Sequence, residues 1–189
     1  MYEGQTSAVL SDYREGTRRL TEYAVSRGHR RVALIHGQMG YATQERMEGF
    51  RTAMKAGGLE VPEEYIRASA FNNPEECARV TEELLALSEP PTCILMPDDY
   101  SAINALWILR EKGISVPEQF SCAGYDGIPL SQAMKPQLTT FWQDTEGIGR
   151  AAVETLLKTM LEGPQANQAI TISGQLIPGG TVADLRKQS

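Results

Sequence analysis

Residues 92–127 read TCILMPDDYSAINALWILREKGISVPEQFSCAGYDG, and the order of elements predicted for this stretch decides the fold. The apolar run at 93–96 indicates a strand, 100–112 indicates a helix, and 120–123 indicates a second strand. Two strands that are joined through one helix run parallel, so their carboxyl ends meet at the same edge of the sheet. In open α/β sheets, ligands bind in the crevice outside that edge.

Three carboxylates follow the two strands of this stretch. Asp98 and Asp99 come after the first strand, and Asp126 comes after the second. We expect all three to face one crevice, where a carboxylate can accept hydrogen bonds from hydroxyls or amines of a ligand. Asp99 is expected to act as the N-cap of the following helix. For Asp98 and Asp126, the alternative to ligand binding is a role in capping or turn formation.

The composition is that of a soluble globular protein, with 41% hydrophobic and 22% charged residues in 189. A net charge of −6 without a basic patch argues against DNA binding by this chain alone. No apolar run is long enough to span a membrane, and residues 1–16 have no feature of a signal peptide. Cys77, Cys93 and Cys122 lie in apolar runs without CxxC spacing, which predicts buried, reduced thiols in a cytoplasmic protein and no metal site.

Outside this stretch, strands alternate with helices, which predicts an α/β fold with a mainly parallel sheet flanked by helices. The clearest helix start is Asn73-Pro74 with Glu76, because these residue types favour the first helical positions. A long helix at 145–162 has an apolar stripe, and the polar tail at 179–189 is expected to fray. The other expected strands are 8–10, 31–35, 65–71, 138–141, 169–173 and 175–177, and the other expected helices are 12–26, 43–56 and 74–87.

The sequence contains no pattern of catalytic residues. Of its two histidines, His29 follows a helix end and is expected to be structural, whereas His36 ends a strand without a nucleophile beside it. The motifs GxSxG, HExxH and GxxxxGK[ST] are absent. We therefore predict a protein that is not an enzyme and that uses no cofactor.

Three further residues lie where they could meet a ligand. Arg46 is near the start of the helix that follows strand 31–35, and its guanidinium would offer a rigid fork of donors. The alternative for Arg46 is a solvated position on the helix surface. Phe71, at the end of a strand, is either part of the core or a wall that stacks on a ring. Gln143, at a strand-to-helix junction, either caps the helix or binds a ligand.

Taken together, several motifs resemble the LacI/GalR family of bacterial transcriptional regulators. They are GHRRVALIHG at 28–37, RMEGFR at 46–51, VPEQFS at 116–121 with GYD at 124–126, and PQLTT at 136–140 with Gln143. The resemblance covers residues 8–178. Two positions depart from the family pattern, because MPDD at 96–99 replaces the usual Ala-Asn-Asp run and Gly127 replaces a second aspartate.

The resemblance implies an effector-binding domain with the periplasmic-binding-protein-like fold, in which a ligand lies between two α/β lobes. One lobe is expected to be complete and the other partial. The implied division is 1–29 as a remnant of the first lobe, 30–141 as the second (C-terminal) lobe, 142–165 as the first-lobe helix after a crossover, and 166–189 as a crossover strand and tail. The helices at 13–26 and 145–161 lack the rest of their lobe, so their faces are expected to be exposed and to drive association.

The resemblance also implies the function and the site. It assigns ligand contacts to Arg46, Phe71, Asp98, Asp126 and Gln143. The implied function is the sensing of a small molecule, a sugar or sugar derivative, in a cytoplasmic homodimer without membrane contact. Operator DNA would be bound only by the full-length protein, through an N-terminal helix-turn-helix that this sequence lacks. A transport-type sugar-binding protein of the same fold is the alternative, disfavoured by the missing export signal and the three unpaired cysteines.

Overall fold

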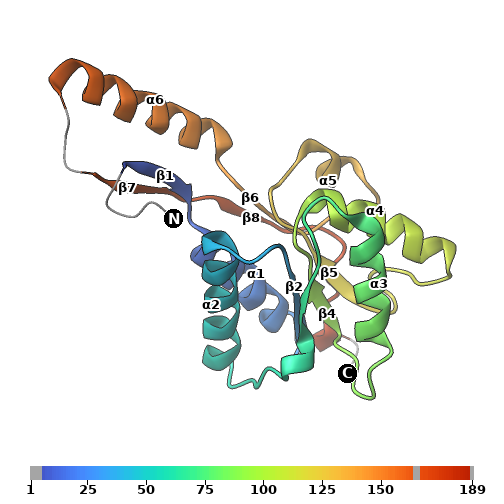
Figure 1. Cartoon of the computed structure of the whole chain (residues 1–189). Helices are drawn as coiled ribbons and strands as arrows, with labels where there is room; N and C mark the ends of the chain where they lie inside the picture. The colour runs from blue at the N-terminus through green and yellow to red at the C-terminus, as the bar shows by residue number, and fades with distance from the viewer. Residues whose placement is uncertain (1–5, 164–166, 188–189) are drawn as a thin grey trace.

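A computed structural model describes residues 6–163 and 167–187, and at its centre lies a parallel four-stranded sheet with strand order β3-β2-β4-β5 (Figure 1). The four strands are β2 (Val32–His36), β3 (Ile66–Ala68), β4 (Cys93–Leu95) and β5 (Ser121–Ala123). Leu34 of β2 pairs with Leu95 on one side and with Ile66 on the other. The parallel sheet predicted from residues 92–127 is therefore confirmed. The parts of the predicted segments at residues 1–5, 164–166 and 188–189 lie outside the described residues.

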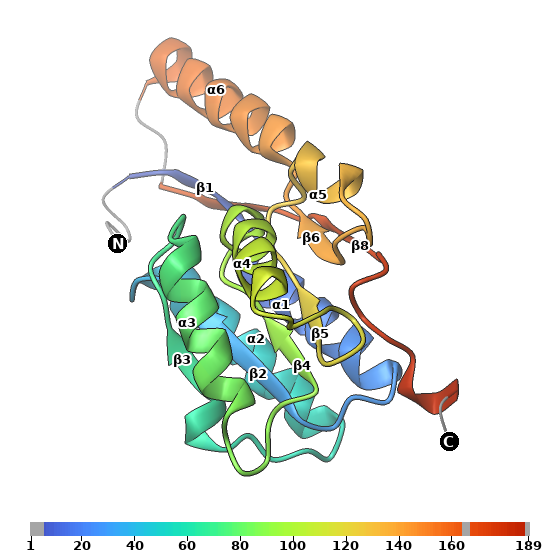
Figure 2. The same cartoon turned by 90° about the vertical axis from the view of Figure 1, so that its right-hand side faces the viewer.

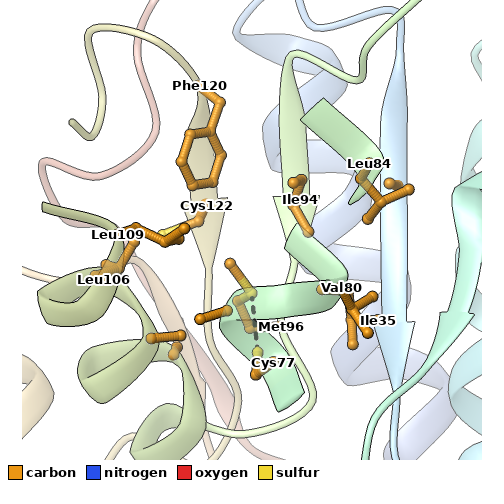
Figure 3. Packing of buried hydrophobic residues seen from close by; sticks show 14 of the residues in the cluster. Ile35, Cys77, Val80, Leu84, Ile94, Met96, Leu106, Leu109, Phe120 and Cys122 are labelled. Carbon is orange, nitrogen blue, oxygen red and sulfur yellow. Dashed lines mark hydrogen bonds between the residues drawn. The ribbon is translucent and has the colours of Figure 1, made fainter. Parts of the chain in front are cut away.

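Helices cover both faces of this sheet (Figure 2). They are α1 (Tyr13–Ser26) and α2 (Tyr41–Ala56) on one face, and α3 (Pro74–Leu85) and α4 (Asp99–Glu111) on the other. Because side chains alternate along a strand, Ala33 and Ile35 pack under α3 and α4 (Figure 3), whereas Val32 and Leu34 pack under α1 and α2. Burial on both faces explains why the strands read as unbroken apolar runs.

A smaller part of the chain extends away from the central sheet (Figure 1). Strand β1 (Ala8–Ser11) pairs in parallel with β7 (Ala169–Ile172), and β6 (Thr140–Trp142) pairs antiparallel with β8 (Gln175–Ile177). Helix α6 (Thr145–Glu162) lies beside β1 and β7 and has no buried residue. Its apolar stripe is open to solvent, with Leu161 84% exposed, whereas the apolar face of α1 is buried against α2. The expectation that the helix at 13–26 has an exposed apolar face is therefore wrong. The expectation that the helix at 145–161 has an exposed apolar face is confirmed.

Side-chain caps mark the starts of several helices. Asn73 caps α3 and Asp144 caps α6, each through a side-chain oxygen that accepts a backbone N–H. The cap of α4 is Asp98, which accepts from the N–H of Ser101 at 2.6 Å. The expectation that Asp99 caps this helix is therefore wrong: α4 begins one residue earlier, and Asp99 is its first residue. Helix α5 (Pro129–Ala133) is also present, in a segment for which the sequence predicts no helix.

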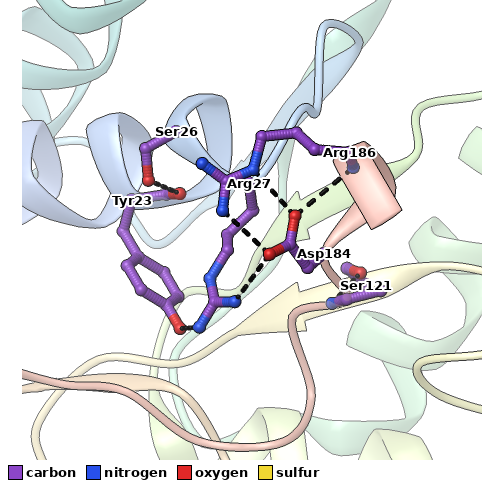
Figure 4. Close-up of polar contacts among 7 residues, drawn as sticks. Tyr23, Ser26, Arg27, Ser121, Asp184 and Arg186 are labelled. Carbon is purple, nitrogen blue, oxygen red and sulfur yellow. Dashed lines mark hydrogen bonds and ion pairs between the residues drawn. The ribbon is translucent and has the colours of Figure 1, made fainter. Parts of the chain in front are cut away.

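The tail at 179–187 is packed, which corrects the prediction that it frays. Thr181 accepts the N–H of Cys122 through its backbone oxygen at 2.9 Å and donates its hydroxyl to the oxygen of Cys122 at 2.8 Å. Two short 3-10 helices, η1 (Glu63–Tyr65) and η2 (Leu185–Lys187), complete the described elements, and η2 ends the tail. Asp184 lies between the guanidinium groups of Arg27 and Arg186, at 3.2 and 2.8 Å (Figure 4). The tail is held because it satisfies polar groups at the edge strand β5.

Candidate functional site

The carboxyl edge of the central sheet carries the predicted site, and Arg46 of α2 is its most buried cation. Only 8% of Arg46 is exposed. Its Nη1 donates to the backbone oxygen of Pro97 at 2.6 Å, and its guanidinium carbon lies 3.6 Å from the ring centroid of Tyr125. The rings of Tyr13 and Phe71 are each 5.7 Å away. The buried Nε of Arg46 has no hydrogen-bond partner among the described residues. Arg46 is thus not the solvated surface arginine that spacing alone allows.

Asp126 and Gln143 contact each other directly. The Nε2 of Gln143 donates to Oδ1 of Asp126 at 2.6 Å, and the backbone N–H of Gln143 donates to the backbone oxygen of Asp126 at 3.1 Å. Asp126 has a φ of 121°, a backbone conformation that residues other than glycine rarely adopt. Burial raises the pKa of Asp126 to about 6, although attraction to Arg46 opposes this shift. The pair therefore places a partly buried carboxyl and an amide at the passage from β5 to α6.

Both carboxylate oxygens of Asp98 accept hydrogen bonds from other residues of the chain. Its Oδ1 accepts the Ser101 N–H at 2.6 Å, and its Oδ2 accepts the Ser101 hydroxyl at 2.9 Å and the Asn72 N–H at 3.1 Å. It is only 4% exposed. These contacts hold the turn that carries Phe71 against the start of α4. A role of Asp98 in holding this turn follows from its contacts, and direct contact with a ligand stays a prediction.

Phe71 lies in a turn, not at the end of a strand as expected, because β3 ends at Ala68. Its side chain is 38% exposed and packs over Gly37. A Cβ at Gly37 would lie 2.1 Å from Cζ of Phe71, so only glycine permits this approach. The ring thus lies between solvent and the guanidinium of Arg46, and it belongs to the rim of the site, not to the core.

Asp99 makes contacts that the sequence did not indicate. It is fully buried, its Oδ1 accepts the Thr140 hydroxyl at 2.6 Å, and its Oδ2 accepts the Ile128 N–H at 2.9 Å. Burial raises the pKa of the Asp99 carboxyl, and the hydrogen bond from Thr140 opposes the rise. Asp99 thereby ties α4 to the residue before α5 and to β6. Tyr125 was also missed as a partner of Arg46, although its place next to Asp126 could have indicated it.

The five predicted residues cluster at one edge, but they do not line one enclosed cavity. A cavity of about 10 Å³ lies under Arg46, with His36, Thr17 and Tyr125 among its other lining residues. Of the five predicted residues, only Arg46 lines it. This volume holds about one water molecule. A much larger cavity, of about 550 Å³, lies elsewhere, on the outer side of α4. We nevertheless locate the candidate site at the sheet edge, because that is where the buried cation, the carboxyl and the amide converge.

The groups at this edge have the chemistry to recognise a ligand. A guanidinium with aromatic rings around it, beside a carboxyl and an amide, can bind hydroxyls, carbonyls and ring faces. Among the described residues, no group of three or more His, Cys, Asp or Glu side chains could hold a metal ion. All three cysteines are buried and free, as predicted, and burial raises the pKa of each thiol. No helix of residues 6–163 and 167–187 is long and apolar enough to cross a membrane.

Comparison with known proteins gives consistent matches. Residues 21–182 match the family described as periplasmic binding protein-like domain. The chain is 31% identical over 180 residues to the HTH-type transcriptional repressor PurR of Vibrio cholerae, which covers 95% of this chain and 53% of that protein. It is 32% identical to the PurR repressor of Escherichia coli, with 95% and 52% covered. The chain therefore spans about half the length of the curated relatives that it matches.

Solved structures of transcriptional regulators are also similar to this chain. A putative LacI transcriptional regulator from Bacillus cereus subsp. cytotoxis superposes with a TM-score of 0.86 at 29% identity, covering 93% of this chain and 62% of that chain. A transcriptional regulator CelR–cellobiose complex superposes with a TM-score of 0.86 at 28% identity, covering 95% and 55%. The strand order, the flanking helices and the sheet edge described above are thus features that this chain shares with proteins of known structure.

Proposed function

This chain belongs to the periplasmic binding protein-like domain family, as a LacI-family effector-binding portion, and we propose that the carboxyl edge of its sheet binds a small-molecule effector. Its relatives are transcriptional regulators, not enzymes. The observation that carries the proposal is the buried guanidinium of Arg46, which stacks on Tyr125 and has one N–H, at Nε, without a hydrogen-bond partner among residues 6–163 and 167–187. A buried polar group without a partner costs free energy, and a bound ligand would supply the missing acceptor.

The proposed effector is a sugar or a sugar derivative. Ring hydroxyls can accept from Arg46 and donate to Asp126, while Phe71 offers an exposed ring for the apolar face of a sugar. The cellobiose bound to the related CelR regulator supports this class of ligand. Arg46, Phe71, Asp98, Asp126 and Gln143 are the proposed contacts, and the contribution of Asp98 is to hold the turn that carries Phe71.

We further propose that binding is coupled to regulation through the segments that leave the central sheet. Asp126 and Gln143 lie at one such segment, and Asp99 bonds to Thr140 and Ile128 on two of them. A ligand that pulls on these residues would move the lobe at 30–141 relative to the other lobe. The parts of that other lobe in this chain are 1–29 and 142–165, and 166–189 is the crossover strand and tail. In the longer cytoplasmic regulator, this movement would bias a homodimer toward or away from operator DNA, which another part of the protein would contact.

The test uses the full-length regulator and a panel of mono- and disaccharides that includes cellobiose, with thermal unfolding as the readout. We expect one sugar to raise the midpoint in the wild type, and Arg46→Ala and Asp126→Asn to reduce the affinity. Each charge-assisted hydrogen bond contributes about 1.5–3 kcal/mol, which is roughly a 10- to 150-fold change. Arg51→Ala is the matched control, because Arg51 is an exposed arginine of the same helix. Unchanged affinity in both site variants would refute the proposed site.

A further inference from the structure

Tyr125 lies against the guanidinium group of Arg46 and contacts it more closely than the other two rings do. The guanidinium carbon is 3.6 Å from the ring centroid of Tyr125, but 5.7 Å from those of Tyr13 and Phe71. The shorter distance is van der Waals contact, so the Tyr125 ring covers one face of the guanidinium group. Tyr125 is buried, whereas Phe71 is exposed. The deepest of the three rings is therefore the one that supports the cation.

The contact joins a cation to a neutral aromatic ring. Burial raises the pKa of the Tyr125 hydroxyl, although attraction to Arg46 opposes this shift, so the hydroxyl stays protonated at neutral pH. The attraction between cation and ring is stronger here than at a surface, because both groups are shielded from water. At the edge of the guanidinium group, Nη1 donates to the backbone oxygen of Pro97 at 2.6 Å. The ring and this hydrogen bond together fix the orientation of the guanidinium group.

The hydroxyl end of Tyr125 lies against α1. A Cβ at Gly16 would lie 2.4 Å from the hydroxyl oxygen of Tyr125 and 2.8 Å from Cδ1 of Phe141, distances that real Cβ atoms do not adopt. Glycine within a helix is unfavourable, so a packing requirement explains Gly16 inside α1. Phe141 of β6 packs beside Tyr125, with ring centroids 5.4 Å apart. Contacts with α1 and β6 thus determine where the Tyr125 ring lies.

We propose that Tyr125 is a positioning residue for effector binding: it packs against Gly16, and its ring holds Arg46 in the orientation that meets the ligand. The role rests on the proposed function, because the orientation of Arg46 matters for binding only if Arg46 contacts an effector. Tyr125 itself acts through Arg46 and does not need to touch the ligand. It follows that the packing of α1, which carries none of the five proposed contacts, controls the geometry of the site.

The alternative is that Tyr125 only fills the core between α1 and α2. Phe50 of α2 is a residue of that kind, since it is fully buried in the same apolar cluster as Tyr125. Among the described residues, the rings that lie over Arg46 are those of Tyr13, Phe71 and Tyr125, and Phe50 is not one of them. Phe50→Leu is therefore the matched control for Tyr125→Leu, because both variants replace a buried ring by the same side chain.

The first measurement follows the Nε–H of Arg46 by nuclear magnetic resonance in the 189-residue chain without ligand. The signal is assigned by its loss in Arg46→Lys. We expect the Tyr125 ring to shift this resonance and burial to preserve it above neutral pH, where exposed arginine N–H groups exchange quickly with water. Tyr125→Leu should lose the shift and the protection, and Phe50→Leu should keep both. An Arg46 signal that Tyr125→Leu leaves unchanged would overturn the proposal.

Gly16→Ala moves the Tyr125 ring without truncating it, so it provides a second variant. The added Cβ should displace the Tyr125 hydroxyl, and the Arg46 signal should move toward its position in Tyr125→Leu. Adding Tyr125→Phe removes the oxygen that the Cβ would meet at 2.4 Å. The double variant should recover part of the wild-type signal, because the contact with Phe141 remains. No response to Gly16→Ala, or no recovery in the double variant, would overturn the packing of Tyr125 against α1.

Affinity for cellobiose and the other sugars of the panel gives the functional measurement. We expect Tyr125→Leu to raise the dissociation constant roughly 30-fold, as for the loss of a buried cation–π contact, and Tyr125→Phe to restore most of this loss. Phe50→Leu should lower the unfolding midpoint without changing the dissociation constant. Equal losses of affinity in the two leucine variants would show a purely structural role. If no sugar binds the wild type, the proposed effector fails, and the Arg46 signal still decides the role of Tyr125.

Discussion

Asp126→Asn isolates one titrating group at the junction between the central sheet and α6. The substitution keeps Oδ1, which accepts the hydrogen bond from Gln143 at 2.6 Å, so the local geometry can be retained. It also keeps a residue type that tolerates the φ of 121° at this position. What it removes is the ability of residue 126 to bind and release a proton. Any pH-dependent difference between the variant and the wild type therefore reports on this one carboxyl.

The size and sign of the effect follow from the pKa. Burial raises the pKa of Asp126 from its ordinary value of 3.8 to about 6, and the nearby Arg46 opposes the rise without cancelling it. The folded state then binds the proton more tightly than the unfolded state, so stability is fully present below pH 3.8 and is lost as pH rises through about 6. Two pKa units correspond to about 3 kcal/mol. Relative to Asp126→Asn, the wild type should lose about that much unfolding free energy between pH 3 and pH 7.

Urea unfolding, followed by circular dichroism at half-unit pH steps, measures this difference directly. All other carboxyl groups titrate in both proteins, so they cancel when the two free energies are subtracted. We expect the difference to change monotonically and to flatten above pH 7. A difference that is constant with pH would refute the inferred burial of the charge. A wild type that gains stability relative to the variant as pH rises would show that attraction to Arg46 outweighs the cost of burial.

Two more substitutions test contacts that hold the junction and the tail. Asp99→Ala leaves the hydroxyl of Thr140 and the N–H of Ile128 without an acceptor, so unfolding free energy in urea should fall by at least about 2 kcal/mol, and Asp99→Asn should recover part of it. Thr181→Val keeps the side-chain volume but removes the hydroxyl that donates to Cys122, so it should cost about 1–3 kcal/mol, and a loss below 0.5 kcal/mol would contradict the packed tail.

The fold could be predicted because its signals are local. The strands at 32–36, 93–95 and 121–123 are short apolar runs between helices, and this alternation allows few arrangements other than a parallel sheet covered on both faces. Helix α5 was missed because its five residues are too short to display a helical period. The tail was misread because Thr181 is polar, and polarity alone does not reveal that a hydroxyl completes the edge of a sheet.

The site could be predicted only in part. The spacing of the sequence located Asp98 and Asp126 at the same edge of the sheet. It could not indicate which carboxylate oxygens would accept hydrogen bonds from backbone N–H groups. The sequence predicted Asp99 as the cap of α4, but Asp98 is the cap, because a shift of one residue decides which side chain reaches the Ser101 N–H. Asp99 thereby became free to bond with Thr140, which lies 41 positions away in the sequence.

The sequence by itself determined which segments are strands and that they run parallel, and hence that Asp98, Asp126 and Arg46 lie toward the same edge of the sheet, because hydrophobic period and chain connectivity are properties of neighbouring residues. The tertiary structure alone decided that Arg46 is buried against Tyr125 and that Asp126 meets Gln143. Burial and hydrogen-bond partners depend on segments far apart in the chain, and their contacts form only when the helices pack.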